Sequence, residues 1–130
     1  MIIAGTVFTY TFAVDSSVYE GFKTIFRDEN PLHTDLDFAK GKGFKERVMY
    51  GNILNGFLSY FVGELLPVKN VIIQSQSINF TSPVYLNDNI TLEAKIEEFY
   101  ESVNSAEIKY KFVNQSGQVV AKGKMQIGVI

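Results

Sequence analysis

The stretch GNILNGFLSYFVGELL, residues 51–66, decides the fold. Its apolar residues go almost all the way round a helix, and Pro67 closes it. A helix that is apolar on nearly every side has to be enclosed by the rest of the chain. It carries Asn55, Ser59 and Glu64 and is too short to cross a bilayer. The stretch therefore predicts a buried central helix.

Strand patterns surround this helix in the sequence. Residues 2–12 have the composition of a strand, and residues 71–80, 90–97, 106–112 and 119–129 predict four more, with a reversing turn at 114–117. One enclosed helix with such strands predicts an α+β fold in which a curled antiparallel sheet wraps round the helix. The length predicts one domain, 1–130, and the open sheet edges favour a homodimer.

The segment between the first strand and the central helix contains two further helix patterns. Asp15 and the two serines after it offer caps for an amphipathic helix that ends near Arg27. Pro31 keeps residues 28–33 in a loop, and Thr34 is the expected cap of a short helix that ends at two glycines, 41 and 43.

Composition excludes several classes of function. Twelve Lys and Arg against 14 Asp and Glu give a net charge of −2, so no global basic field attracts nucleic acid or an anionic membrane. With no cysteine, the chain has no disulfide, no thiolate nucleophile and no zinc site built on sulfur. The start of the sequence does not read as a signal peptide, and a reducing cytoplasm is the expected location.

One short segment gathers the groups needed for acid–base chemistry. Asp28, Asn30 and His33 lie within six residues, and His33 is the only histidine. Pro31 enforces a bent backbone, so the carboxylate and the imidazole can fold back toward each other and share one water. Taken alone, either residue reads as an ordinary loop side chain, but the combination indicates general acid–base catalysis.

The motif Asp28-x-Asn-Pro-Leu-His33 resembles the signature of the MaoC-like (R)-specific enoyl-CoA hydratases, which have a hot-dog fold. The resemblance continues through Arg47-Val-x-x-Gly51, the central helix, and the segments QSINF (76–80) and PVYLND (83–88). It covers roughly residues 20–99 with recognisable landmarks, and the last two strands fit only by pattern.

This resemblance implies a dimeric hydratase, or a dimer of dimers. It would take an acyl thioester of coenzyme A or acyl carrier protein and add water across a trans-2 double bond. Asp28 and His33 match the catalytic pair, and the Gly51 amide matches the donor to the thioester oxygen, as the free amides of a helix N-terminus would allow. Asn30 would hold the loop. No metal or redox cofactor is implied.

The chain departs from the family pattern near this donor. Tyr50 stands where the family commonly has His, Asn52 where it commonly has Met, and Phe26 and Arg27 replace smaller or acidic residues before the Asp. Asn52, Asn55 and Ser59 share one helical stripe. They read either as a polar wall of the substrate site or as hydrogen-bonded core groups, and Tyr50 as a wall residue or as packing.

A basic run follows the motif. Residues 40–47 hold four positive charges and one negative, a net +3 in an acidic chain. Such a run is commonly a solvated loop. We hypothesise that Lys42, Lys45 or Arg47 meets the phosphates of coenzyme A or the acidic face of a carrier protein.

Three other functions stay open. The first is a biosynthetic 3-hydroxyacyl-[acyl carrier protein] dehydratase, and the second is a non-catalytic acyl-thioester-binding protein. The third is thioester hydrolysis, which is less favoured because hydrolases of this fold generally carry a carboxylate on the central helix, and residues 51–63 contain none.

Overall fold

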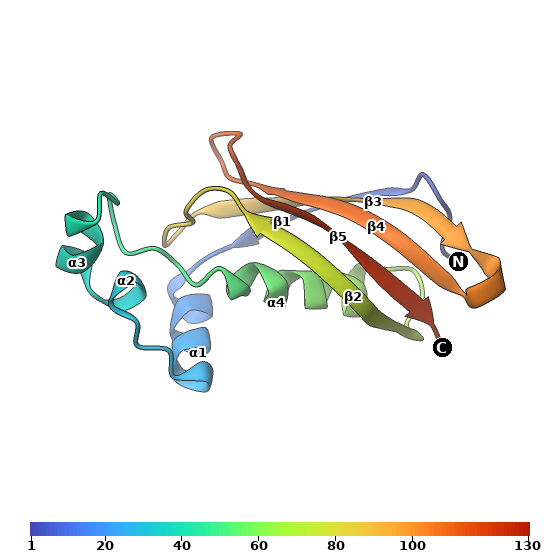
Figure 1. Cartoon of the computed structure of the whole chain (residues 1–130), viewed down its shortest axis with the longest axis horizontal. Coiled ribbons are helices and arrows are strands. Elements are labelled where there is room, and N and C mark those ends of the chain that lie inside the picture. The colour runs from blue at the N-terminus through green and yellow to red at the C-terminus, as the bar shows by residue number, and fades with distance from the viewer.

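The computed structural model describes residues 1–130 and shows one curved antiparallel sheet lying along one helix, α4 (Asn52–Tyr60) (Figure 1). The five strands lie in the order β1-β3-β4-β5-β2. Their bounds are β1 Val7–Ala13, β2 Val71–Phe80, β3 Asn89–Tyr100, β4 Ser105–Val113 and β5 Val119–Val129. The hot-dog fold expected from the resemblance is confirmed.

The core lies between α4 and the concave face of the sheet. Ile53, Leu54 and Leu58 point from α4 into this layer and are 4% exposed or less. They meet the alternate residues of β3, among them Ile90 and Leu92. Each aliphatic side chain buried in this way stabilises the fold by roughly 1.5–3 kcal/mol, and it is this layer that fixes α4 against the sheet.

The outer face of α4 is open in the single chain. Gly56, Ser59 and Tyr60 are exposed, so the prediction of a helix enclosed on every side is wrong for one subunit. The last turn also differs from a regular α-helix, since Phe61–Leu65 forms a π-helix before the backbone becomes extended at Leu66.

Three short helices precede α4. Helix α1 (Ser16–Phe26) begins as expected, because the Asp15 carboxylate accepts a hydrogen bond from the Val18 amide at 3.0 Å. Helix α2 (Pro31–Thr34) corrects the predicted loop. Its cap is Asn30, whose side chain accepts from the Leu32 amide at 3.0 Å, and the proline occupies a first-turn position that needs no amide hydrogen.

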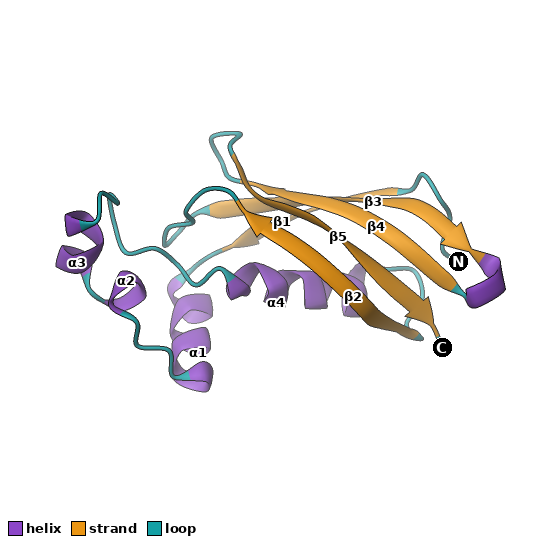
Figure 2. Ribbon diagram, viewed as in Figure 1, coloured by secondary structure: helices purple, strands orange, loops and turns teal.

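Helix α3 (Leu36–Gly41) is capped by Asp35, which accepts from the Phe38 amide at 3.1 Å. The expected cap, Thr34, belongs to α2, and its hydroxyl turns back toward the Glu29 and Asn30 carbonyls. Helices α1 to α3 gather at one end of the molecule, beyond the N-terminal end of α4, and both chain termini lie at the other end (Figure 2). The residues of the motif, 28–33, are thereby brought close to the N-terminus of α4.

No helix of the structure is long and apolar enough to span a membrane.

Candidate active site

His33 is held by its backbone and by its ring. Its Nδ1 lies 2.7 Å from the Val48 carbonyl oxygen, which can only accept, so Nδ1 carries the hydrogen and donates. In the neutral ring, Nε2 then has the free lone pair and can take up a proton. The Tyr50 ring packs against the imidazole with centroids 4.3 Å apart. His33 is therefore oriented as a base.

Gly51 shares a cavity of about 370 Å³ with His33. Apolar side chains, including Phe44, Leu54 of α4 and Phe80 at the end of β2, line the same space. Gly51 precedes the first turn of α4, and its amide takes part in none of the backbone hydrogen bonds, so the N–H is available to a ligand. A Cβ at this position would lie 3.2 Å from the Phe80 ring, which explains why glycine fits there.

Asp28 lies in a neighbouring groove. One carboxylate oxygen accepts from the Asn30 amide at 3.0 Å, which fixes the turn before α2. The groove, about 830 Å³, runs between α1 and α4, and Phe22, Phe26 and Phe57 form much of its apolar wall. Asp28 is exposed in the single chain, so its second oxygen is open to water.

The two cavities approach each other at the N-terminus of α4. Gly51 lines the cavity of His33, and the next residue, Asn52, lines the groove of Asp28. The structure thus brings His33 and the Gly51 amide into one space and places Asp28 in the adjoining one. Asn30 serves the turn through its backbone and side chain, as expected, and lines neither cavity.

The amides on the polar stripe of α4 form a chain of hydrogen bonds. Asn55 Nδ2 donates to Asn52 Oδ1 at 2.7 Å, and Gln76 of β2 donates to Asn55 Oδ1. Asn52 and Asn55 both line the groove that holds Asp28. Ser59, on the same stripe, is exposed and lines none of the cavities, so the polar wall ends before it.

Tyr50 is a buried residue, and its side chain does not line either cavity. It is 3% exposed, and burial, with smaller contributions from Tyr19 and Asp28, raises its pKa to about 12. The phenol therefore stays protonated at any ordinary pH and donates its hydrogen to the Asp28 carbonyl oxygen at 2.5 Å. The sequence predicts neither this hydrogen bond nor a contribution of Tyr19 to the site, because the positions of both tyrosines are typical of buried packing residues.

The basic run lies outside both cavities. Lys42 sits over the Phe38 ring and Lys45 over the Tyr85 ring, with 5.4 and 4.7 Å from Nζ to the ring centroids. Arg47 lies over the Tyr19 ring and pairs with Glu46 at 3.7 Å. Within residues 40–47, only Phe44 lines the cavity of His33.

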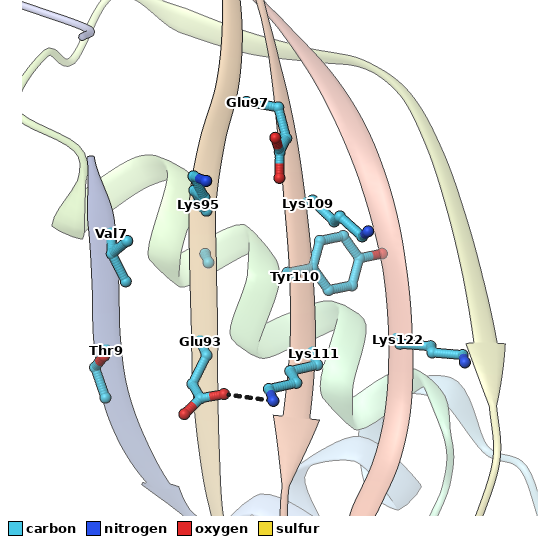
Figure 3. Close-up of a pocket in the computed structure, with 10 residues that line it drawn as sticks. Val7, Thr9, Glu93, Lys95, Glu97, Lys109, Tyr110, Lys111 and Lys122 are labelled. Atoms are coloured by element: carbon cyan, nitrogen blue, oxygen red, sulfur yellow. Dashed lines mark ion pairs between the residues drawn. The ribbon is translucent and has the colours of Figure 1, made fainter. Parts of the chain in front are cut away.

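Another hollow lies on the outer face of the sheet, on the side away from α4 (Figure 3). Lysines and glutamates from β3, β4 and β5 surround it. One ion pair, between Lys111 of β4 and Glu93 of β3 at 3.2 Å, joins these neighbouring strands. It holds no histidine and no helix terminus. The only histidine and the N-terminus of α4 lie at the site of His33 and Gly51, not in this hollow.

Comparison with known proteins gives matches over most of the chain. Residues 4–119 match the family model described as MaoC like domain. The chain is 30% identical over 103 residues to the (R)-specific enoyl-CoA hydratase of Aeromonas caviae, an alignment that covers 79% of this chain and 77% of that protein. Two other relatives, from Rhodospirillum rubrum and Methylorubrum extorquens, align over about half their length, 53% and 54%.

Two further matches cover nearly the whole chain. A mitochondrial 3-hydroxyacyl-[acyl-carrier-protein] dehydratase of Arabidopsis thaliana is 27% identical, over 95% of this chain and 75% of that protein. Among solved structures, the (R)-hydratase from A. caviae superposes with a TM-score of 0.90 at 25% identity, covering 99% of this chain and 98% of that one.

Proposed function

Because this chain belongs to the MaoC-like domain family, we propose that it is an (R)-specific hydratase and dehydratase that interconverts trans-2-enoyl and (R)-3-hydroxyacyl thioesters of coenzyme A. The observation that carries the proposal is the shared cavity of His33 and the free Gly51 amide at the mouth of α4. An imidazole base and an unused N–H beside one small space are what hydration of an enoyl thioester needs.

In the hydration direction, a water bound between Asp28 and His33 loses a proton to this pair while its oxygen attacks the β carbon. The same pair returns a proton to the α carbon on the same face, so no net proton is gained or lost. Negative charge develops on the thioester oxygen, where the Gly51 N–H donates a hydrogen bond and the positive end of the α4 dipole adds to it. His33 suits this exchange because Val48 fixes its tautomer and leaves Nε2 free.

Crotonyl-CoA tests the proposal. We expect the enoyl absorbance to fall without release of free thiol, and Asp28→Asn and His33→Ala to abolish the change. Release of thiol would show hydrolysis instead. Tight binding with neither signal would show an acyl-thioester-binding protein, and the proposal would be wrong.

A 3-hydroxyacyl-[acyl carrier protein] dehydratase is the second candidate, and the match to the Arabidopsis dehydratase over 95% of the chain favours it. The chemistry is the same and only the carrier differs. Turnover of one acyl chain on coenzyme A and on acyl carrier protein separates the two. A variant with Lys42, Lys45 and Arg47 neutralised shows whether the basic run binds either carrier, through the KM and its salt dependence.

We also propose a homodimer, with the dimer of dimers as the larger assembly. Strand β2 supports it, because this ten-residue edge strand has no charge and no proline to protect its unpaired backbone. The proposed steps need only proton transfer and charge stabilisation, so we expect no metal or redox cofactor, and dialysis against a chelator to leave the rate unchanged. The reducing cytoplasm stays the expected compartment.

A further inference from the structure

Tyr50 contacts both proposed catalytic residues at once. Its hydroxyl donates to the Asp28 carbonyl oxygen at 2.5 Å, and its ring lies against the His33 imidazole, with centroids 4.3 Å apart and planes inclined by 36°. No other side chain of the structure is hydrogen-bonded or stacked to both residues. The separation between the Asp28 backbone and the His33 ring therefore depends on this phenol.

Tyr19 holds the other end of the same segment. Its hydroxyl donates to the His33 carbonyl oxygen at 2.7 Å, and Arg47 donates to that hydroxyl at 3.4 Å. The Tyr19 and Tyr50 rings stack with centroids 5.8 Å apart. Phe22 of α1 also stacks on the Tyr50 ring, with centroids 4.6 Å apart. The two phenols thus form one packed unit, which we call the tyrosine pair.

The other contacts of residues 28–33 do not set the spacing between Asp28 and His33, which leaves that role to the tyrosine pair. Bonds among Asp28, Asn30 and Leu32 shape the turn but lie within the segment itself. The bonds of Leu32 and His33 with Val48 tie only the His33 end to the rest of the chain. Near the Asp28 end, the Glu29 and Asn30 carbonyls accept from the hydroxyl of the adjoining Thr34, and the Tyr50 hydroxyl is the hydrogen bond from a part of the chain distant in sequence.

We infer that Tyr50, supported by Tyr19, is a positioning residue that sets the spacing between Asp28 and His33. This rests on the proposed hydratase function. A loss of position by a fraction of an ångström lowers the rate of a step that needs two groups on one water, while substrate affinity is little changed.

The test compares Tyr50 with a second buried tyrosine, Tyr110, that contacts neither Asp28 nor His33. Tyr110 is also 3% exposed, its pKa is also raised to about 12 by burial, and its hydroxyl also donates to a backbone carbonyl, that of Ser77 at 3.3 Å. We expect Tyr50→Phe to lower kcat on crotonyl-CoA about 10- to 100-fold with KM within about twofold, and Tyr110→Phe to leave both constants unchanged.

His33 gives a second readout that does not need activity, because it is the only histidine. Its imidazole proton resonances should move in Tyr50→Phe and stay in place in Tyr110→Phe. In the double variant Tyr19→Phe/Tyr50→Phe, kcat should fall by less than the product of the single effects, since the tyrosines act together.

Three results would overturn the inference: wild-type kcat in Tyr50→Phe, unchanged His33 resonances, or equal losses in the two matched variants. A wild-type protein that is inactive on enoyl thioesters would instead refute the proposed function. The His33 resonances would then still show whether Tyr50 sets the geometry.

Discussion

His33 and Asp28 are held in very different ways. The His33 ring is fixed by the Val48 carbonyl and by the Tyr50 face, and its backbone carbonyl by the Tyr19 hydroxyl. The Asp28 carboxylate has one bond, to Asn30 in its own turn, and its second oxygen is open. The His33 side chain is therefore held from several sides, whereas the Asp28 carboxylate is held only by its own turn.

This difference predicts the outcome of His33→Asn. The amide of Asn can occupy the place of the Nδ1–H and still donate to the Val48 carbonyl, but it cannot take up a proton. We expect kcat to fall about 10²- to 10⁴-fold, with stability changed by less than about 0.5 kcal/mol. Turnover of crotonyl-CoA and urea unfolding measure the two effects. Activity near wild type would remove His33 from the mechanism.

Gly51 carries a second prediction at this scale. An added Cβ would press on the Phe80 ring at 3.2 Å and shift the amide that we assign to the thioester oxygen. We expect Gly51→Ala to lower kcat about tenfold and stability by about 1 kcal/mol.

The control is Gly63→Ala, where a Cβ meets nothing within 4 Å and kcat should be unchanged. If both variants keep wild-type kcat, the Gly51 amide is not the donor.

At the scale of elements, the sequence predicts a helix or strand wherever burial of one face gives the apolar residues a regular spacing. Residues 90–97 alternate because one face of β3 lies on α4, and Asp15 begins α1 by an ordinary capping bond. Helix α2 was missed because four residues are too few for a period, and Asn30-Pro31 is typical of both a turn and a helix start. The π-helix of residues 61–65 was missed because apolar residues lie nearly all the way round this helix, so their spacing marks no single face from which a change of period can be read.

The site was predictable only where residues are close in sequence. Asp28 and His33 form a local motif, and Gly51 marks the start of a helix. The tyrosine pair joins residues 14 to 22 positions apart, and in the sequence Tyr19 is only one apolar position of an amphipathic helix. The hydrogen bond of a buried tyrosine hydroxyl cannot be predicted from the spacing of hydrophobic residues, because that spacing is the same with or without the bond.

Helix α4 gives a prediction of its own. Gly56 lies within this helix, is exposed, and has nothing within 4 Å of an added Cβ. Since Ala is favoured over Gly in a helix, we expect Gly56→Ala to raise the free energy of unfolding by roughly 0.5–1 kcal/mol. Urea unfolding measures this. A loss of stability would mean that the outer face of α4 is tightly covered in solution.

For the whole molecule, buried tyrosines set the stability at high pH. The pKa of Tyr50 and that of Tyr110 are raised by burial from 10 to about 12. Both phenols therefore keep their protons in the fold where the unfolded chain has lost them. Their contribution is full below pH 10 and is lost as the pH rises through about 12.

Urea midpoints between pH 9 and 12 test this dependence. We expect the midpoint to fall over this range, and the fall to be shallower in Tyr110→Phe, which lacks one of the two groups. Tyr100→Phe gives the comparison, because that tyrosine is 45% exposed. An equally steep fall in Tyr110→Phe would show that ionised phenols are not the cause.

The proposed dimer has two candidate interfaces at the edges of the sheet, which are β1 and β2. Every residue of β2 is exposed or half-buried, on both faces, and the strand has no lysine or proline to prevent pairing. Ile72 of β2 and Val7 of β1 are exposed aliphatic residues, 51% and 61%, on opposite edges. Substituting each by lysine therefore tests one edge at a time.

We expect Ile72→Lys to give monomers by light scattering and to lose activity, since the groove of Asp28 is open in a single chain and the partner is needed to close it. Val7→Lys should remain a dimer with wild-type kcat. The opposite result would assign the interface to β1, and a dimer in both variants would place it on the exposed face of α4, where Gly56→Ala would then be destabilising rather than stabilising.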